Sequence, residues 1–287
     1  MSSISTSLKD KFLNGALSIT LMSVLFGFLL GGIILLLAGF NPLEAYGVIL
    51  KGIFSRPKYV SYVIIYSTPL IITGLSVAFA LRTGLFNIGA EGQYIMGALA
   101  AAAAGYYLKL PMVLHVFTAV GLAVLVAAFW GGLAGWFKAR FGVNEVISTI
   151  MLNWTALYIS NWAITIPSFG RQGTGKTYAI QPTAQIDILG QWKRTPEGIA
   201  FLREHPMLWD VLKSPVNLGF VFAILLAALV WYVLNRTTLG YELRAVGHNP
   251  QAAEAGGISV KRSMVISMLF AGGLAGAAGA FQVLGVS

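Results

Sequence analysis

The sequence predicts an all-α protein, a polytopic bundle of membrane-spanning helices. Of its 287 residues, 57% are hydrophobic and only 10% are charged, and the mean hydropathy is +0.77. Soluble domains carry about 45–50% apolar and about 25% charged residues, so the bilayer is the expected solvent. The apolar residues also gather in runs of about 20, the length that a helix needs to cross about 30 Å of hydrocarbon.

Seven apolar runs give the predicted spans. The first begins after Lys9 and Lys11 and is longer than the apolar core of a secretory signal, which has about 7–15 residues. We therefore expect it to be retained as a span. One transmembrane domain is expected over residues 1–287. Its predicted spans are residues 16–40, 62–81, 93–108, 113–137, 143–166, 216–234 and 263–286.

The loops between these spans decide the orientation. With the N-terminus in the cytoplasm, residues 138–140 and 235–262 are cytoplasmic and residues 167–215 lie outside. The positive-inside rule supports this orientation weakly, because nine Lys and Arg residues fall inside and ten fall outside. The orientation therefore depends mainly on a motif within residues 235–262.

The composition excludes several other functions. The net charge is +9, but the 19 basic residues are scattered between apolar runs, so we predict no nucleic-acid binding. The absence of cysteine excludes disulfides and thiol catalysis. His115, His205 and His248 lack the spacing of metal ligands, so no metal site is predicted. No catalytic constellation such as paired carboxylates is visible, so we do not expect an enzyme.

A polar segment, residues 82–93, interrupts the apolar sequence. It reads RTGLFNIGAEGQ, and its three glycines loosen a helix. The span that follows, 93–108, would be about 23 Å long as a helix, too short to cross the hydrocarbon unless the polar segment enters it. Broken helices at that depth are tolerated where they line a cavity. We predict a discontinuous helix with Asn87, Glu91 and Gln93 along a pathway; the alternative is a surface loop with an ordinary exposed glutamate.

The predicted span 143–166 carries polar and aromatic residues at helical intervals, namely Asn153, Trp154, Tyr158 and Asn161. Aromatic residues near a membrane surface usually anchor a helix at the interface. Buried asparagines often bond neighbouring helices. Two interpretations stay open: this helix lines the pathway through these four residues, or they only anchor and pack it.

The last predicted span has small residues at every fourth position, among them Gly272, Gly276 and Ala280. A stripe of small residues lets helix backbones approach closely. We expect this span to pack tightly inside the bundle.

A short helix is predicted between the last two spans. Asn249 suits the N-cap, Pro250 the first helical position, and Gly256 or Gly257 the C-terminus. The helix would have fewer than two turns and lie on the cytoplasmic side. An ATPase domain that drives transport could bind such a helix. The alternative is an interhelical loop with only a structural role.

Residues 170–177 match the phosphate-binding pattern G-x-x-x-x-G-K-[ST]. That loop works when it joins a strand to a helix whose N-terminus meets the phosphates. Here it follows a span and Pro167, and it leads to residues 178–182, which do not begin a helix. We interpret the match as coincidence.

Three segments resemble the signatures of a known family. They are residues 86–93 (FNIGAEGQ), 142–153 (GVNEVISTIMLN) and 244–253 (RAVGHNPQAA). They are similar to segments of the permease subunits of ABC importers for simple sugars and nucleosides, the ribose-type permeases. The nearer match is the nucleoside branch, whose systems use a membrane lipoprotein as receptor. The resemblance runs through nearly the whole chain.

The resemblance implies partners and a location. Such permeases act by alternating access, as half of a channel completed by a second permease subunit. A separate ATPase subunit binds ATP and Mg, so no cofactor is expected on this chain. A substrate-binding lipoprotein and a nucleoside are the other expected partners, in a bacterial plasma (inner) membrane with the N-terminus cytoplasmic. The implied ATPase-coupling residues are Glu242, Arg244, Gly247, Asn249, Pro250, Ala252, Ala253 and Gly256.

Alternatives remain at this level. The same importer class could carry a simple sugar such as ribose. An ion-coupled secondary transporter would need acidic groups in mid-membrane, for which only Glu91 and Glu145 qualify. The family normally has further spans after residues 263–286, so the resemblance also implies a chain truncated at its C-terminus and lacking part of the site.

Overall fold

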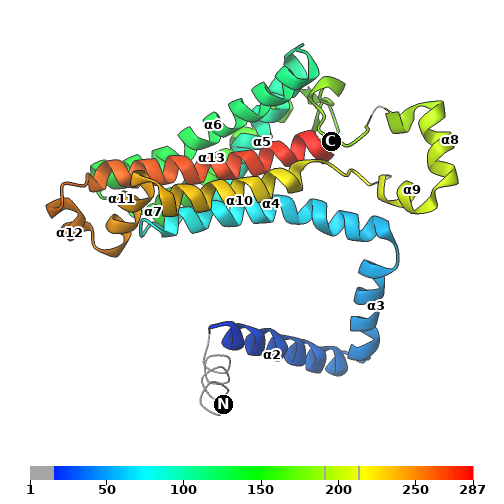
Figure 1. The fold of residues 1–287 in the computed structure, drawn as a ribbon, viewed down its shortest axis with the longest axis horizontal. Coiled ribbons are helices and arrows are strands. Elements are labelled where there is room, and N and C mark those ends of the chain that lie inside the picture. Colours follow the sequence, from blue (N-terminus) through cyan, green and yellow to red (C-terminus); the bar gives the residue numbers. More distant parts are fainter. Residues whose placement is uncertain (1–15, 191, 213, 287) are drawn as a thin grey trace. The chain divides into compact units, whose positions relative to one another are not determined.

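The computed structural model describes residues 16–190, 192–212 and 214–286, and these are nearly all helical. They form twelve α-helices, α2 to α13, together with two 3-10 turns and one two-stranded sheet. The chain divides into two compact units, Met1–Val60 and Ser61–Ser287, and each is described by itself. Figure 1 labels the elements.

The first unit contains α2 (Ala16–Leu37) and α3 (Pro42–Phe54). The first is the helix predicted over residues 16–40, and it ends three residues earlier. The second was not predicted, although its start has a local signal. The Asn41 side chain caps it by accepting from the Leu43 N–H, and Pro42 occupies the first helical position.

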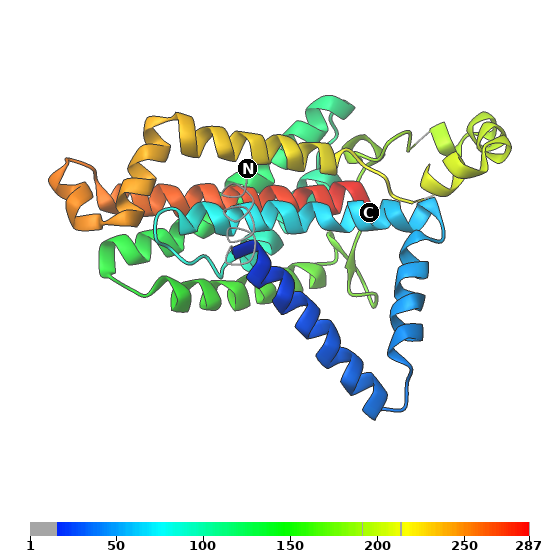
Figure 2. The ribbon, with the colours of Figure 1, turned by 60° about the horizontal axis from the view of Figure 1, so that its bottom comes forward.

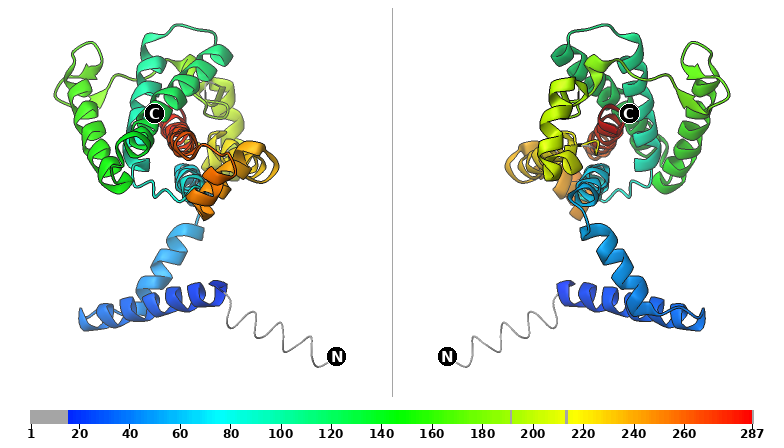
Figure 3. Two further views of the ribbon diagram at one scale, coloured as in Figure 1. Left: turned by 90° about the vertical axis from the view of Figure 1, so that its left-hand side faces the viewer. Right: turned by 90° about the vertical axis from the view of Figure 1, so that its right-hand side faces the viewer.

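The second unit is built around α13 (Val260–Val286). Every residue from Ala271 to Phe281 is buried, and Figure 3 shows this helix surrounded by others. Its glycines set the distance to its neighbours, since a Cβ on Gly97 of α5 would overlap the backbone of Gly276. The tight packing predicted from the small residues is therefore confirmed. The helices packed most extensively on α13 are α5 (Ala90–Tyr107) and α6 (Met112–Phe141).

Two more long helices run alongside α13 in both Figures 1 and 2. They are α4 (Pro57–Leu81) and α10 (Gly219–Arg236). Phe79 of α4 stacks on Phe270, and Phe222 of α10 stacks on Phe281. The remaining helices of the bundle and its end are α7 (Glu145–Thr165), α11 (Thr238–His248) and α12 (Pro250–Ala255).

Five of the described helices are long and apolar enough to cross a membrane: α2 from Ser18 onward, α4, α6, α10 and α13. The predicted spans 93–108 and 143–166 are also helices, α5 and α7, but they fall short of that criterion. Their polar residues explain the shortfall, since α5 begins with Glu91 and Gln93 and α7 carries Asn153 among others. The seven-span, single-domain arrangement stays a prediction.

The polar stretch predicted over residues 167–215 folds into short elements. They are β1 (Gly170–Arg171), β2 (Lys176–Thr177), η1 (Pro182–Ala184), η2 (Trp192–Arg194), α8 (Pro196–Glu204) and α9 (Pro206–Leu212). The two strands pair as an antiparallel hairpin that contains the whole phosphate-loop match. Gly173 and Gly175 turn the chain with positive φ, and no helix begins directly after β2. The segment thus lacks the strand-to-helix geometry of a phosphate loop.

Candidate functional site

The predicted interruption is visible between α4, which ends at Leu81, and α5, which begins at Ala90. The connecting residues 82–89, hereafter the break loop, turn at Gly84, whose φ of 74° favours glycine. Leu85 then points inward: it is 1% exposed and packs with Ala134, Met268 and others in a buried cluster. The break loop is therefore part of the core of the second unit.

Two predicted pathway residues form a closed pair inside this core. The Asn87 Nδ2 donates to Gln93 Oε1 at 2.9 Å, and the Gln93 Nε2 donates to Asn87 Oδ1 at 3.0 Å. Asn87 also donates to Ser76 Oγ at 3.3 Å, and that hydroxyl donates to the Ala271 carbonyl at 2.6 Å. Both amide side chains are only 1% exposed. In this conformation they brace α4, α5 and α13 together.

Asn153 of α7 holds the same loop from the other side. Its Oδ1 accepts from the Gly92 N–H at 2.8 Å, and its Nδ2 donates to the Ile88 carbonyl at 3.1 Å. The N-cap residue of α5, Gly89, has no side chain to cap the helix. Asn153 therefore supplies, from another helix, an acceptor that the first turn of α5 lacks.

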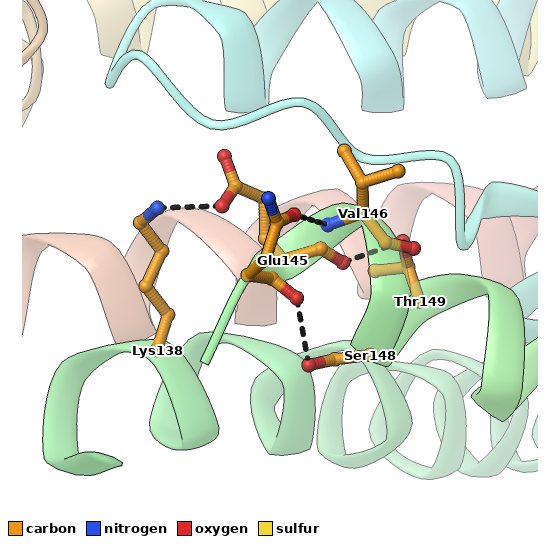
Figure 4. Close-up of polar contacts among 6 residues, drawn as sticks. Lys138, Glu145, Val146, Ser148 and Thr149 are labelled. Carbon is orange, nitrogen blue, oxygen red and sulfur yellow. Dashed lines mark hydrogen bonds and ion pairs between the residues drawn. The ribbon is translucent and has the colours of Figure 1, made fainter. Parts of the chain in front are cut away.

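An ion pair fixes the corner between α6 and α7 beside the break loop (Figure 4). The Lys138 Nζ lies 2.5 Å from Glu145 Oε2, and the Glu145 carboxylate also accepts a hydrogen bond from the backbone of Phe86. Gly142, with φ of 69°, ends α6, and Asn144 caps α7 by accepting from the Val146 N–H. From the sequence, Glu145 was a candidate only for ion coupling.

The hydroxyls of the first turn of α7 complete this corner. Ser148 Oγ donates to the Asn144 carbonyl at 3.0 Å, and Thr149 Oγ1 donates to the Glu145 carbonyl at 2.7 Å, as Figure 4 shows. The polar groups at the start of α7 are thus bonded locally, which leaves the Glu145 carboxylate directed at Lys138 and the break loop.

The other predicted pathway residues are exposed. Trp154 and Tyr158 are 55% and 66% exposed on one face of α7, with ring centroids 6.3 Å apart, and Asn161 is exposed one turn further. Glu91 is also exposed, at an open groove of about 540 Å³ between α4 and α5 that Tyr94 and Thr73 also line. The seven predicted residues therefore divide into a bonded set, namely the buried Asn87 and Gln93 and the half-buried Asn153, and an exposed set, namely Glu91, Trp154, Tyr158 and Asn161.

The short helix predicted between the last two spans is confirmed as α12. The Asn249 side chain accepts from the Ala252 N–H at 3.1 Å, Pro250 is at the first helical position, and Gly256 is the C-cap. Asn249, Pro250 and Ala252 are exposed, whereas Ala253 is buried. Only one of the two alanines therefore faces outward.

The predicted coupling residues on α11 lie closer to the bundle. Glu242 and Arg244 are half-buried, and the Arg244 Nε donates to the Gly240 carbonyl at 3.2 Å. Gly247 packs against the break loop: a Cβ on Gly247 would overlap the Arg82 carbonyl oxygen, and a Cβ on Gly84 would lie 3.6 Å from Gly247 Cα. The structure thus brings together two segments that sequence analysis treated separately.

The described part of the chain contains no group of three His, Asp or Glu side chains placed to hold a metal ion. His115 is buried, with Nδ1 2.8 Å from Thr183 Oγ1 and Nε2 3.1 Å from the Ala104 carbonyl. His205 stacks on Phe201. These two histidines have structural contacts that explain their positions.

Comparison with known proteins places the chain in a family. A family model described as branched-chain amino acid transport system / permease component matches residues 59–287. The guanosine ABC transporter permease protein NupP of Bacillus subtilis is 38% identical over 94% of this chain and 72% of that protein.

Two further relatives extend the comparison. The nucleoside ABC transporter permease protein NupB of Lactococcus lactis is 33% identical, over 91% of this chain and 69% of its own length. A glucose ABC transporter permease protein of Haloferax volcanii is 30% identical over 92% and 67%. No solved structure matches the chain. With its five candidate spans, this chain belongs to the family of ABC-transporter permease components, multi-pass membrane proteins that serve as transport subunits and not as enzymes.

Proposed function

We propose that the chain is the membrane-spanning subunit of an ABC importer that carries nucleosides into the cell. The observation that carries this proposal is the 38% identity, over 94% of the chain, to a guanosine permease. The nucleoside permease of Lactococcus lactis supports the same substrate class.

The proposed importer contains a separate ATPase that binds ATP and Mg²⁺, a second permease subunit and a substrate-binding lipoprotein. The exposed α12 supports the ATPase contact, because it is capped at both ends and is therefore a separate helix from α11 and α13. Asn249, Pro250 and Ala252 offer the exposed surface, and Ala253 anchors the helix to the bundle. We place no nucleotide on this chain, and the hairpin that carries the phosphate-loop match supports this.

The proposed orientation has a cytoplasmic N-terminus in the bacterial plasma (inner) membrane. The contacts of the second unit support the part of this orientation that puts residues 138–140 and 235–262 on one side of the membrane. Gly247 meets the break loop, and the break loop meets the α6–α7 corner, so the two connections predicted to be cytoplasmic adjoin the same loop. At the other end, Gln181 donates its N–H to the Gly105 carbonyl and Ile186 to that of Leu284, so the predicted outer segment 167–215 packs on the ends of α5 and α13 (Figure 1).

We propose that the pathway passes the exposed set of residues, and that the bonded set shapes it. Glu91, Trp154, Tyr158 and Asn161 offer one carboxylate, one amide and two aromatic faces. A nucleoside presents a base that stacks and a sugar that forms hydrogen bonds, and stacking of a base on an aromatic side chain contributes about 1–3 kcal/mol. Asn87, Gln93 and Asn153 fix the break loop beside this surface. ATP-driven closure of the ATPase would move α12, and this movement would switch the pathway between its outward-facing and inward-facing states.

The complete importer in lipid vesicles tests the proposal. Labelled guanosine, adenosine, uridine and ribose are offered at equal concentration, with and without ATP on the ATPase side. We expect ATP-dependent uptake of nucleosides. Uptake that continues without ATP while an ion gradient is held would instead indicate a secondary transporter.

The second candidate function is import of a simple sugar, favoured by the glucose permease relative at 30% identity. The same experiment separates the two substrates. Uptake of ribose without any nucleoside would overturn the nucleoside assignment and leave the importer class standing.

A further inference from the structure

We propose that the break loop is the joint through which movement of α11 and α12 reaches the bundle, with Gly247 as its input contact and Glu145 as the positioning residue on its output side. This inference rests on the proposed function, because it assigns a path to the movement that an ATPase would impose on α12.

The input is a backbone-to-backbone contact. Gly247 lies in the last turn of α11, two residues before the α12 N-cap Asn249. Its α-carbon faces the backbone of Arg82 and Gly84 so closely that a Cβ would overlap the Arg82 carbonyl oxygen. Such a contact has no flexible side chain to absorb a displacement. A shift of the last turn of α11 therefore displaces the start of the break loop or opens this contact.

The break loop is tied along its length to α13, α4 and α5, so a displacement of the loop is passed on to these helices. Thr83 Oγ1 donates to Ser267 Oγ at 2.9 Å, Leu85 is buried, and Asn87 is bonded to Gln93 and Ser76. Every buried side-chain polar atom in the described part of the chain has a hydrogen-bond partner. A network satisfied in this way resists bending within the loop.

The output is a pair of contacts that the break loop makes with the end of α6 and with α7. The backbone of Phe86 bonds the Glu145 carboxylate, which is paired with Lys138 at the end of α6. Two residues on, the Ile88 carbonyl accepts from Asn153 of α7. Displacement of the break loop therefore pulls on α7, whose exposed face carries the proposed pathway residues.

A competing route exists, because the chain continues from α12 into α13 through residues 256–259. A variant at Gly247 separates the two routes. Gly247→Ala disturbs the contact with the break loop but leaves the covalent connection to α13 intact. Gly121→Ala is the matched control: Gly121 lies within α6, and a Cβ there meets nothing within 4 Å.

The readout is the reactivity of a single cysteine placed at Phe86, in the assembled importer. The chain has no other cysteine, and the Phe86 side chain is 48% exposed while only its backbone takes part in the proposed contact. Its reaction with a water-soluble maleimide is timed without nucleotide and with ATP plus vanadate. We expect nucleotide to change the rate about fivefold or more in the parent and in Gly121→Ala, and less than about twofold in Gly247→Ala.

Two results would contradict the proposal that the break loop is the joint. If nucleotide does not change the labelling rate at position 86 in the parent, the joint is contradicted. If the change is as large in Gly247→Ala as in the parent, the movement reaches the bundle through the chain connection from α12 to α13 instead. The labelling is measured without any transported solute, so its outcome does not depend on which substrate the importer carries. If no ATPase co-purifies with the chain, the proposed function itself fails, and that failure is recognised before any labelling.

Two double variants test the output side even if Gly247→Ala fails to assemble. Lys138→Met with Glu145→Gln removes both charges but keeps an acceptor for the Phe86 N–H. Lys138→Glu with Glu145→Lys keeps the ion pair but puts a side chain that cannot accept a hydrogen bond at position 145. We expect the first to transport within about threefold of the parent and the second to lose about tenfold, while hydrolysing ATP. Full transport by the charge-swapped variant would reduce Glu145 to an ion-pair partner and overturn its positioning role.

Discussion

Two pairs of residues were predicted to line the substrate pathway but lie in different environments. One pair is Asn87 and Gln93, and the other is Trp154 and Tyr158. The two amides are 1% exposed and bonded to each other, whereas the two aromatic residues are more than half exposed. A polar group in a membrane-embedded bundle must find a partner in the chain or face a surface where water, substrate or another subunit supplies one. The comparison separates residues that shape a pathway from residues that can line it.

The same division occurs within a single helix. Asn153 and Asn161 both lie on α7, yet Asn153 bonds the break loop through both of its polar atoms, while Asn161 is exposed. Identical side chains on one helix can thus serve packing in one turn and remain free for other contacts two turns later.

The largest effect is expected for Asn87→Leu. The substitution leaves the Gln93 amide with two buried atoms that have lost their partners, and a buried unsatisfied group costs about 1–3 kcal/mol. We expect the free energy of unfolding to fall by about 3 kcal/mol. Thermal unfolding of the purified chain in detergent, followed by circular dichroism, measures the change.

A double variant provides the control for that loss. Asn87→Leu with Gln93→Leu removes both amides, and replacing both partners by apolar groups of similar shape can be nearly neutral. We expect the double variant to be more stable than Asn87→Leu alone. Additive losses would show that the two amides do not brace each other.

A smaller effect is expected on α7, where one substitution is made at two sites. Asn153→Ala removes the acceptor for the Gly92 N–H and the donor to Ile88, and loss of a cap costs about 1 kcal/mol. Asn161→Ala should change the stability by less than about 0.5 kcal/mol. The same thermal assay compares them, and equal losses at both positions would remove the distinction drawn here.

The sequence was sufficient for features that depend on neighbouring residues. The caps of α12 were predicted because Asn249, Pro250 and Gly256 act within one turn, and the long helices because hydropathy is local. The equally local signal of Asn41 and Pro42 for α3 was present but not used. The hairpin β1–β2 departs from an all-α fold because paired glycines turn a short polar loop on itself.

Contacts that depend on how a loop turns or on how helices pack could not be predicted in this way. The Asn87–Gln93 pair depends on how Gly84 turns the loop, and the Gly247 contact joins residues more than 160 positions apart. For Asn153 the polarity left two interpretations open, a pathway or helix packing, and its bonding to the break loop follows from how α5 and α7 pack. The residue types indicated that these positions have a role, but the partners of each residue became known only from the packing of the helices.

Cysteine labelling sharpens the contrast directly. Single cysteines at Glu91 and Tyr158 should react with a water-soluble thiol reagent about tenfold faster than one at Asn87, since hydrogen-bonded core positions open rarely. In the assembled importer, nucleoside should slow the reaction at Glu91 and Tyr158. A cysteine at Leu29, on the apolar α2, gives the baseline for a site facing lipid. Fast, substrate-protected labelling at Asn87 would instead place the amide pair on the pathway.

The smallest expected effect is none at all, at Lys176 of the hairpin. A phosphate loop needs consecutive backbone N–H groups at a helix N-terminus, with the lysine reaching over them. Lys176 instead lies in β2, paired with Arg171 of β1 across a turn of exposed residues. Lys176→Ala should therefore leave ATP-driven uptake within about twofold of the parent, as expected for a surface substitution.

The control for Lys176→Ala is nucleotide binding to the purified chain without its ATPase, measured by equilibrium dialysis with labelled ATP. The parent and the variant should both show none. Binding that disappears in Lys176→Ala would mean that the hairpin rearranges around phosphate. It would also move residues 167–215 to the side of the membrane where ATP is present, because the orientation proposed here puts α12 and this hairpin on opposite sides. An exposed lysine in this hairpin thus tests the proposed orientation of the chain in the membrane.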